Sequence, residues 1–256
     1  MNRAALPAIV LALVPASAGT SATSRPLALT AAPARLALRG SESAAVRIRN
    51  PGTKRLVVDV ALAGFALDLR GRPHIVRRRS PRSAVRWIRV RPTHFSLAPH
   101  ATAHLRVSAS VPRLAEPGDH DALVLLNSRP LAGARVLVRL RLGVVVVVRA
   151  PGAVVRRLKL GRLGVARRGG RRTLELGVVN AGNVTERLLR VRTSVSRPAG
   201  RRIATAAAPA RELRPHTRGL LEFHLRTGIR GPVTVRVAVP AEAGRAAIRR
   251  TYRLRI

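Results

Sequence analysis

The chain contains no cysteine, and lysine, aromatic and acidic residues are scarce among its 256 residues. Without cysteine it can form no disulfide, no thiolate metal site and no lipid-modified cysteine anchor. Aromatic residues make up 2% of the sequence, so almost no side chains are available for nucleic-acid bases to stack on. The sequence also has no convincing amphipathic helix that would enter a DNA groove. These absences argue against a sequence-specific nucleic-acid-binding protein.

The scarcity of acids produces an extreme charge. The 11 Asp and Glu residues stand against 49 Lys and Arg residues, which gives a formal net charge of +38. Only Lys54 and Lys159 are lysines. Coding bias in a GC-rich genome explains arginine in place of lysine but not the shortage of acids, so selection for an anionic partner is the competing explanation. The electrostatic field of a protein with this charge attracts polyanions such as wall polymers, anionic lipid headgroups or nucleic acid.

The first 22 residues have the three parts of a secretory signal peptide. Arg3 supplies the positive region, residues 4–14 form an apolar run, and Pro15 breaks that run before small residues. An N-terminal membrane anchor is the alternative, but an apolar run this short spans a bilayer poorly. We therefore predict a signal peptide over residues 1–22 and a mature protein that is secreted or held in the extracytoplasmic cell envelope.

Short runs of alternating apolar and polar residues fill the chain after residue 26, with Gly, Pro and Asn between them. Such alternation predicts β-strands separated by turns. The apolar run at residues 142–148, which contains five consecutive valines, is typical of a strand buried on both faces. Because 46% of the residues are apolar, the chain can build one large core or two ordinary ones. The pattern predicts an all-β protein made of β-sandwiches.

Two landmarks occur twice in the same order. Asn-Pro-Gly at residues 50–52 corresponds to Asn-Ala-Gly at residues 180–182, and each ends one strand and opens a tight turn. Leu-Ala-Pro-His at residues 97–100 corresponds to Leu-Arg-Pro-His at residues 213–216, where Pro fixes φ at a corner between two sheets. We therefore predict two tandem immunoglobulin-like β-sandwich domains, with these bounds: residues 27–150 and residues 151–256.

The first unit carries a further series of landmarks. The first is a Gly turn at Gly71, and the second is Trp87, which comes shortly before a Leu-x-Pro turn at residues 97–99. A strand then closes in Val-Pro at residues 111–112, and a Pro-Gly turn at residues 117–118 leads into a later strand. In this series the unit resembles the peptidoglycan-binding domain of WxL-interacting proteins, although that family has Gly where this chain has His100. Pilus-chaperone-like and other bacterial immunoglobulin-like domains share part of the pattern. The resemblance implies a wall-associated adaptor or adhesin scaffold.

The sequence does not point to catalysis or to a bound cofactor. Most acids lie on polar strand faces or in turns, where pairing with the abundant arginines is expected. The segment at residues 116–122, Glu-Pro-Gly-Asp-His-Asp-Ala, gathers three acids and His120, but nothing in its spacing shows that metal ligands converge. Trp87 is better interpreted as a plug between sheets than as a ligand platform. We predict a protein that is not an enzyme and that needs neither cofactor nor metal.

Clusters of arginine are the better candidates for a binding site. Arginine binds phosphate and carboxylate groups in a forked geometry, which suits acidic polymers. Solvated loops are the alternative interpretation of the same clusters. The candidate polyanion-binding residues are Arg77, Arg78, Arg79, Arg82, Arg167, Arg168, Arg171, Arg172, Arg201 and Arg202.

The leading functional prediction is a non-enzymatic envelope adaptor or scaffold. Its expected partner is an anionic wall polymer or peptidoglycan, with a surface protein as a second option and peripheral membrane contact left open. The alternative is a periplasmic pilus-chaperone-like module that assists assembly of a partner by β-strand complementation. A secreted accessory domain of a carbohydrate-active protein is a third interpretation.

Overall fold

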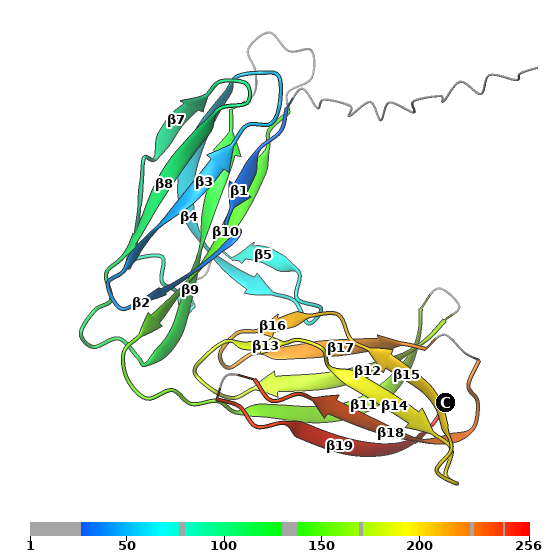
Figure 1. The fold of residues 1–256 in the computed structure, drawn as a ribbon. Coiled ribbons are helices and arrows are strands. Elements are labelled where there is room, and N and C mark those ends of the chain that lie inside the picture. The colour runs from blue at the N-terminus through cyan, green and yellow to red at the C-terminus, as the bar shows by residue number, and fades with distance from the viewer. Residues whose placement is uncertain (1–26, 77–79, 130–137, 169–170, 226–227, 243) are drawn as a thin grey trace, which may run out of the picture.

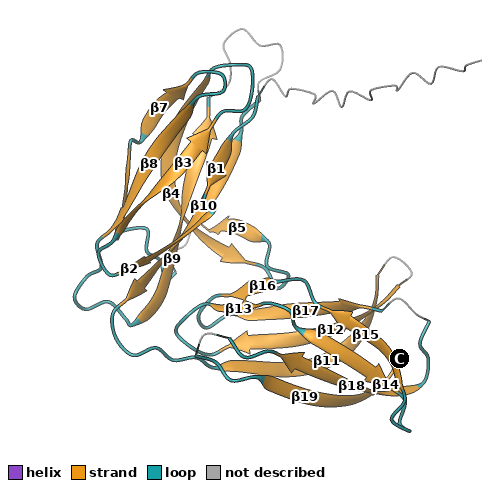
Figure 2. Ribbon diagram, in the orientation of Figure 1, coloured by secondary structure: helices purple, strands orange, loops and turns teal. Residues whose placement is uncertain are grey.

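The computed structural model describes residues 27–76, 80–129, 138–168, 171–225, 228–242 and 244–256. Within these residues the structure consists of strands and loops, and Figure 2 shows no helix among them. No helix in the described ranges is long and apolar enough to cross a membrane. The strands form two β-sandwiches that follow one another along the chain (Figure 1), so the predicted all-β fold of two immunoglobulin-like sandwiches is confirmed.

Ten strands form the first sandwich within the described residues. They are β1 (Thr30–Ala32), β2 (Arg35–Arg39), β3 (Ser43–Arg49), β4 (Leu56–Leu67), β5 (Pro73–Val76), β6 (Ile88–Arg91), β7 (His94–Leu97), β8 (Thr102–Ala109), β9 (Gly118–Ser128) and β10 (Arg141–Ala150). One sheet has the order β1-β3-β8-β6, and the other has the order β2-β10-β9-β4-β5, with β7 also paired to β4. The chain therefore leaves the first sheet after β1 and joins the second sheet as β2.

The described part of the second sandwich contains nine strands. They are β11 (Leu158–Arg168), β12 (Arg171–Asn180), β13 (Glu186–Leu188), β14 (Arg192–Ser196), β15 (Arg202–Ala207), β16 (Arg211–Leu213), β17 (Arg218–His224), β18 (Pro232–Val239) and β19 (Ile248–Arg255). Its sheets have the orders β11-β12-β17 and β15-β14-β18-β19, with β13 and β16 forming a short pair.

Each sandwich buries its own apolar core. Val46, Ile48 and Leu105 lie in the first core, which draws its residues from both sheets of the first sandwich. Leu174 and Phe223 lie in the second core, whose described residues all come from Leu158 onward. The period of two along each strand places alternate side chains in these cores, as the sequence pattern predicts.

Within each sandwich, the Asn-x-Gly landmark is hydrogen-bonded to the Leu-x-Pro-His landmark. Asn50 and Asn180 are both fully buried. The Asn180 side-chain amide donates to the carbonyls of Leu213 and Arg214, at 3.0 and 3.1 Å, and so holds the Leu-x-Pro-His corner. The Asn50 amide donates in the same way to the carbonyls of residues 97 and 98. The corner is repeated because each sandwich uses a buried asparagine to pin it.

The histidine of each corner has a backbone role. His100 and His216 have φ values of 60° and 55°, in the left-handed region that glycine tolerates best. Both histidines thus occupy a conformation that is uncommon for a residue other than glycine. The two side chains differ in their surroundings, since His216 Nε2 lies 3.2 Å from the Arg82 guanidinium at the junction of the sandwiches.

The valine-rich strand β10 is buried on both faces, as predicted. Val144, Val146 and Val148 are fully buried in the first core. On the opposite face Val145 packs against a small apolar cluster that contains Phe65. That cluster exists because the long β4–β5 hairpin extends across the outside of the sheet toward the second sandwich (Figure 1).

Candidate functional site

One edge of β10 is open along the first part of the strand. β10 pairs with β9 along its whole length, from Arg141 to Ala150. On its other side it pairs with β2 only from Val145 to Arg149. Among the described residues, no strand pairs with Arg141–Val144 on that side, because the preceding segment β1 belongs to the other sheet.

The backbone hydrogen bonds show which groups face this edge. The N–H of Val145 donates to Ala34, on the β2 side, and the carbonyl of Leu140 accepts from Ser128, on the β9 side. Since successive residues of a strand direct their N–H and C=O groups to opposite sides, those of Arg141 and Gly143 point toward the open edge.

The side chains beside the open edge alternate in character. Leu140 and Leu142 pack against the first core but stay only partly buried, and Val138 is 42% exposed. Arg139 and Arg141 are exposed on the other face. An apolar row that is incompletely covered therefore lies along a strand edge whose backbone groups have no partner strand in the part of the chain that the structure describes. Such an edge is a template for an added strand.

A cavity of about 270 Å³ lies between the two sandwiches at the far end of β10. Val145 and Val147 of β10 line it from one side, and the β4–β5 hairpin contributes Phe65. Arg214 of the second sandwich also lines the cavity, with its guanidinium 4.6 Å from the centre of the Phe65 ring. The cavity thus combines an apolar wall with cationic groups.

The β4–β5 hairpin fastens the sandwiches together. The carbonyl of Leu69 accepts a 2.7 Å hydrogen bond from the N–H of Leu220, at the edge of β17. Arg70 at the hairpin tip lies 3.2 Å from Glu222 and 3.6 Å from Glu175. These contacts give the hairpin a partner in the second sandwich, so it spans the junction instead of extending into solvent.

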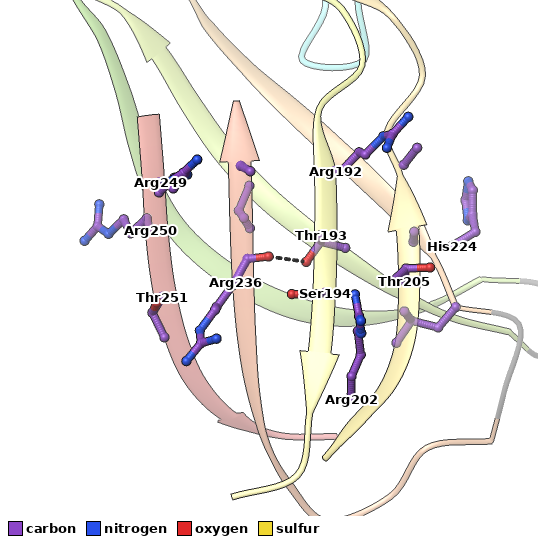
Figure 3. A pocket seen from close by; sticks show the side chains of 15 residues that line it. Arg192, Thr193, Ser194, Arg202, Thr205, His224, Arg236, Arg249, Arg250 and Thr251 are labelled. Atoms are coloured by element: carbon purple, nitrogen blue, oxygen red, sulfur yellow. Dashed lines mark hydrogen bonds between the residues drawn. The ribbon is translucent and has the colours of Figure 1, made fainter. Parts of the chain in front are cut away.

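The predicted arginine clusters do not form one site. Arg77, Arg78 and Arg79 lie outside the described residues, and the side chains of Arg168 and Arg171 are likewise not described. Arg167 and Arg172 pair across the β11–β12 hairpin, but the Arg172 guanidinium donates to the carbonyl of Ile229. Arg201 and Arg202 are exposed, and only Arg202 lines a hollow, on the second sandwich (Figure 3).

Arg82 has a different environment from the exposed cluster in which the sequence places it. It is 8% exposed, and its guanidinium contacts the Glu116 carboxylate and the carbonyl of Pro117. It also approaches His216 of the second sandwich. The charge of Arg82 is therefore used inside the junction, which corrects its expected role as a free polyanion ligand.

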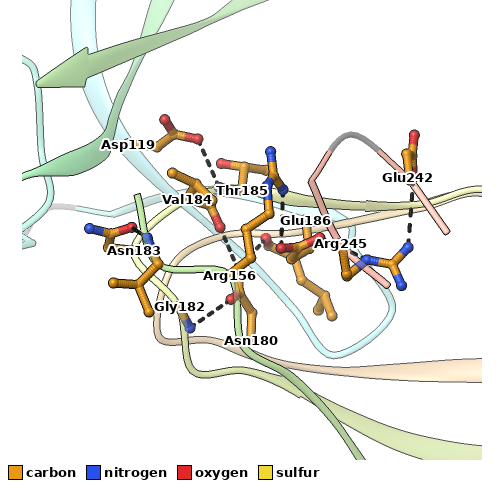
Figure 4. Close-up of polar contacts among 12 residues, drawn as sticks. Asp119, Arg156, Asn180, Gly182, Asn183, Val184, Thr185, Glu186, Glu242 and Arg245 are labelled. Carbon is orange, nitrogen blue, oxygen red and sulfur yellow. Dashed lines mark hydrogen bonds and ion pairs between the residues drawn. The ribbon is translucent and has the colours of Figure 1, made fainter. Parts of the chain in front are cut away.

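The acid-rich segment at residues 116–122 also belongs to the junction. Asp119 is 3% exposed and accepts a 2.7 Å hydrogen bond from Arg149 and another from the backbone N–H of Thr185, in the second sandwich (Figure 4). The Asp119 N–H in turn donates to the carbonyl of Asn183. Gly118 has a φ of 110°, and a Cβ there would lie 2.1 Å from that carbonyl oxygen, so only glycine fits. Among the described residues, no group of His, Asp and Glu is arranged to hold a metal ion.

Asp121 is the most perturbed acid of the junction. It is 4% exposed and pairs with Arg214 of the second sandwich. Burial raises the pKa of Asp121 to about 6, against the opposing influence of the Arg214 guanidinium.

We expect Asp121 to make folding less favourable as the pH rises from about 4 to about 6. In that range an unfolded Asp121, with a pKa of 3.8, has lost a proton that the folded protein retains. Because the folded state then binds more protons, raising the pH favours the unfolded state. Urea unfolding of the wild type and of Asp121→Asn at several pH values measures this contribution. Between pH 4 and pH 6, Asp121→Asn should lack the decrease in the free energy of unfolding that Asp121 causes in the wild type. An identical pH dependence in the two proteins would contradict the prediction.

Sequence reasoning missed the open edge and most of the junction contacts. It did recognise that the acids at residues 116–122 would pair with arginine. It did not show that Asp121 pairs with Arg214 of the second sandwich or that Asp119 accepts from the N–H of Thr185 there. The available signal was the Pro-Gly turn at residues 117–118, which marks a strand that starts where the sandwiches meet. The open edge has no such signal, because it depends on which strand β2 leaves uncovered.

The fold and the edge together define a class: a protein of two immunoglobulin-like β-sandwiches with an unpaired strand edge and an interdomain cavity. The chain is similar to the crystal structure of the class 5 fimbriae chaperone CfaA, with a TM-score of 0.51 and 11% identity over 88% of this chain and 98% of that chain. A chain from the chaperone–tip adhesin complex of CFA/I fimbriae biogenesis gives a TM-score of 0.50 and 11% identity, over 88% of this chain and 98% of that chain. No family model and no curated protein matches the sequence.

These comparisons correct the leading functional prediction. The predicted adaptor that binds wall polymer or peptidoglycan is wrong, because the structures similar to this chain belong to fimbrial chaperone systems. They favour the alternative, a chaperone-like module. The resemblance of the first sandwich to WxL-interacting proteins is not tested by these comparisons and stays a prediction.

Proposed function

We propose that this protein is a non-enzymatic, extracytoplasmic assembly chaperone that holds a partner subunit by β-strand complementation. The observation that carries the proposal is the open edge of β10 at Arg141–Val144. A partner strand laid along this edge would receive main-chain hydrogen bonds from Arg141 and Gly143. Affinity then comes from the backbone and specificity from alternate side chains.

The apolar row beside the edge supports this role. Leu140 and Leu142 are partly buried and Val138 is exposed, so an incoming strand would cover apolar surface that this chain leaves wet. Arg139 and Arg141 lie between them and are exposed. Charged residues on an edge oppose pairing between two copies of the same chain, because like charges would meet. The edge is therefore suited to a different protein and is protected against self-association.

The partner is proposed to be an exported surface subunit that lacks one strand of its own fold. An extracytoplasmic location follows from the predicted signal peptide and agrees with the fimbrial systems in which similar structures occur. The +38 charge would also speed the encounter with an acidic subunit.

The proposal predicts that Arg141→Pro abolishes partner binding and leaves the fold intact. Arg141 is the first residue of β10, and its N–H faces the open edge, so proline removes a donor that β9 does not use. The protein is purified from its native source, and any bound exported subunit is quantified by mass spectrometry. We expect the variant to retain less than about one tenth of the subunit.

A matched control separates the edge from the charge. Arg139→Gln removes one exposed arginine beside the edge but leaves every backbone donor, so it should retain the subunit within about twofold. A photo-crosslinking residue at position 141 should attach to one strand of the subunit, whereas the same residue at Arg106 on the opposite sheet should not. Subunit recovery that is unchanged by Arg141→Pro, or equal crosslinking at the two positions, would overturn the proposal.

A further inference from the structure

A large hollow lies on the outer face of the sheet β15-β14-β18-β19, away from the junction and from β10 (Figure 3). Its volume is about 1630 Å³. The buried residues Val195 and Val235 of this sheet face the second core, and the alternating residues between them, such as Ser194 and Arg236, face outward. The outward-facing residues therefore give the hollow an open surface, and its lining also includes the buried residues Thr193, Val237 and Leu225.

Strand register explains the shape of the hollow. One row across the four strands contains small residues between arginines: Ala207, Arg192, Ala238 and Arg249. The next row contains one arginine among three hydroxyl side chains: Thr205, Ser194, Arg236 and Thr251. Short side chains therefore alternate with long arginines across this face. Arg192 and Arg249 are two strands apart, which separates their Cα atoms by roughly 10 Å.

Four of the five arginines that line the hollow have no partner among the described residues, whereas Arg250 donates to the carbonyl of Leu160. Within the described residues, the guanidinium groups of Arg192, Arg202, Arg236 and Arg249 make no hydrogen bond or ion pair, and all four are exposed. No acidic residue lines the hollow. The acids that pair with arginine lie elsewhere, as Asp119 and Glu186 do in buried ion pairs. The charge on this face is therefore available to an external anion.

The side chains that line the hollow indicate which class of anion it would bind. Arginine offers only hydrogen-bond donors, and the lining contains no Phe, Tyr or Trp, so a ligand would need dense acceptors. His224 is the one ring among the lining residues, which is too few for a series of stacked bases. The concave face also suits a flexible chain better than a flat bilayer. Arginines at intervals suit a repeated anion, since each guanidinium takes a phosphate in forked geometry. We propose that this hollow binds a linear oligophosphate.

The test uses inorganic tripolyphosphate as the probe and the full chain as the protein. Isothermal titration at physiological salt should give saturable binding to one site and weaker binding of orthophosphate. The variant Arg192→Gln, Arg236→Gln, Arg249→Gln should lose about tenfold or more in affinity, because three forked contacts are removed. Circular dichroism should show an unchanged fold, since all three side chains are exposed.

A control of equal charge tests whether the site is local. Arg47, Arg49 and Arg89 are exposed on the outer face of the first sandwich, so their triple Gln variant loses the same charge elsewhere. It should bind tripolyphosphate within about twofold of the wild type. Equal losses in the two variants would mean only diffuse attraction and would overturn the proposal. An absence of saturable tripolyphosphate binding would also overturn the proposal. The same holds if the protein binds single-stranded DNA or phosphatidylglycerol vesicles more tightly than tripolyphosphate and only the hollow variant loses that binding.

Discussion

Replacing Asn180 with alanine should lower the free energy of unfolding of the second sandwich by about 3 kcal/mol or more. The Asn180 amide is fully buried and donates to the carbonyls of Val184, Leu213 and Arg214. Its side-chain oxygen accepts from the N–H of Gly182 at 2.9 Å. Alanine supplies none of these bonds, and the carbonyls of Val184 and Leu213 accept the amide in a buried environment. The corner that contains the Leu-x-Pro-His turn would then lose its anchor.

Hydrogen exchange followed by mass spectrometry gives a readout for each sandwich. In Asn180→Ala, protection should fall in β12 and β17 and stay unchanged in β3 and β8. Asn127→Ala is the matched control, because the partly buried Asn127 side chain accepts one 2.9 Å bond from the exposed Arg141. It should change stability by less than about 1 kcal/mol. Equal losses of protection in the two variants would refute the anchoring role of Asn180.

Replacing Glu186 with alanine should destabilise the second sandwich by about 3–5 kcal/mol. Glu186 is 2% exposed and lies between Arg156, at 3.1 Å, and Arg245, at 3.2 Å. The Arg245 side chain is 5% exposed, so the substitution leaves a buried guanidinium without its closest carboxylate (Figure 4). An uncompensated buried charge costs more than the pair contributed when intact.

Glu212→Ala provides the comparison for Glu186→Ala. Glu212 also pairs with two arginines, Arg35 at 3.3 Å and Arg187 at 3.5 Å, but its side chain is 33% exposed. Water solvates the arginines that this substitution frees, so the loss should be about 1 kcal/mol or less. Urea unfolding monitored by far-ultraviolet circular dichroism measures both variants. A Glu186→Ala loss no larger than that of Glu212→Ala would show that the buried pairs do not contribute as argued.

Much of the fold was predictable from local pattern. Alternation identified strands such as the one containing Leu105 and Val107, and the repeated Asn-x-Gly and Leu-x-Pro-His landmarks predicted two sandwiches. These signals are reliable because the strand period and the turn conformations are properties of a few neighbouring residues. The valine run at residues 144–148 likewise indicated a strand buried on both faces.

The candidate sites were much less predictable. A run of arginines near residue 80 suggested an exposed cluster, but Arg82 is buried against Glu116 and His216. In the hollow, only Arg202 was among the arginines that local clustering selected. Arg192, Arg236 and Arg249 are isolated along the chain and become neighbours through the register of strands β14, β18 and β19.

The sequence by itself determined the strand pattern, the tandem repeat and the excess of positive charge. Tertiary structure alone decided that β2 covers only half of β10, so that Arg141–Val144 keep an open edge. It also decided which arginines are neutralised at the junction and which face solvent. The physical reason is one of range: periodicity and turn preference act over a few residues, whereas an unpaired edge or a site of converging charges depends on pairing between strands far apart in the chain.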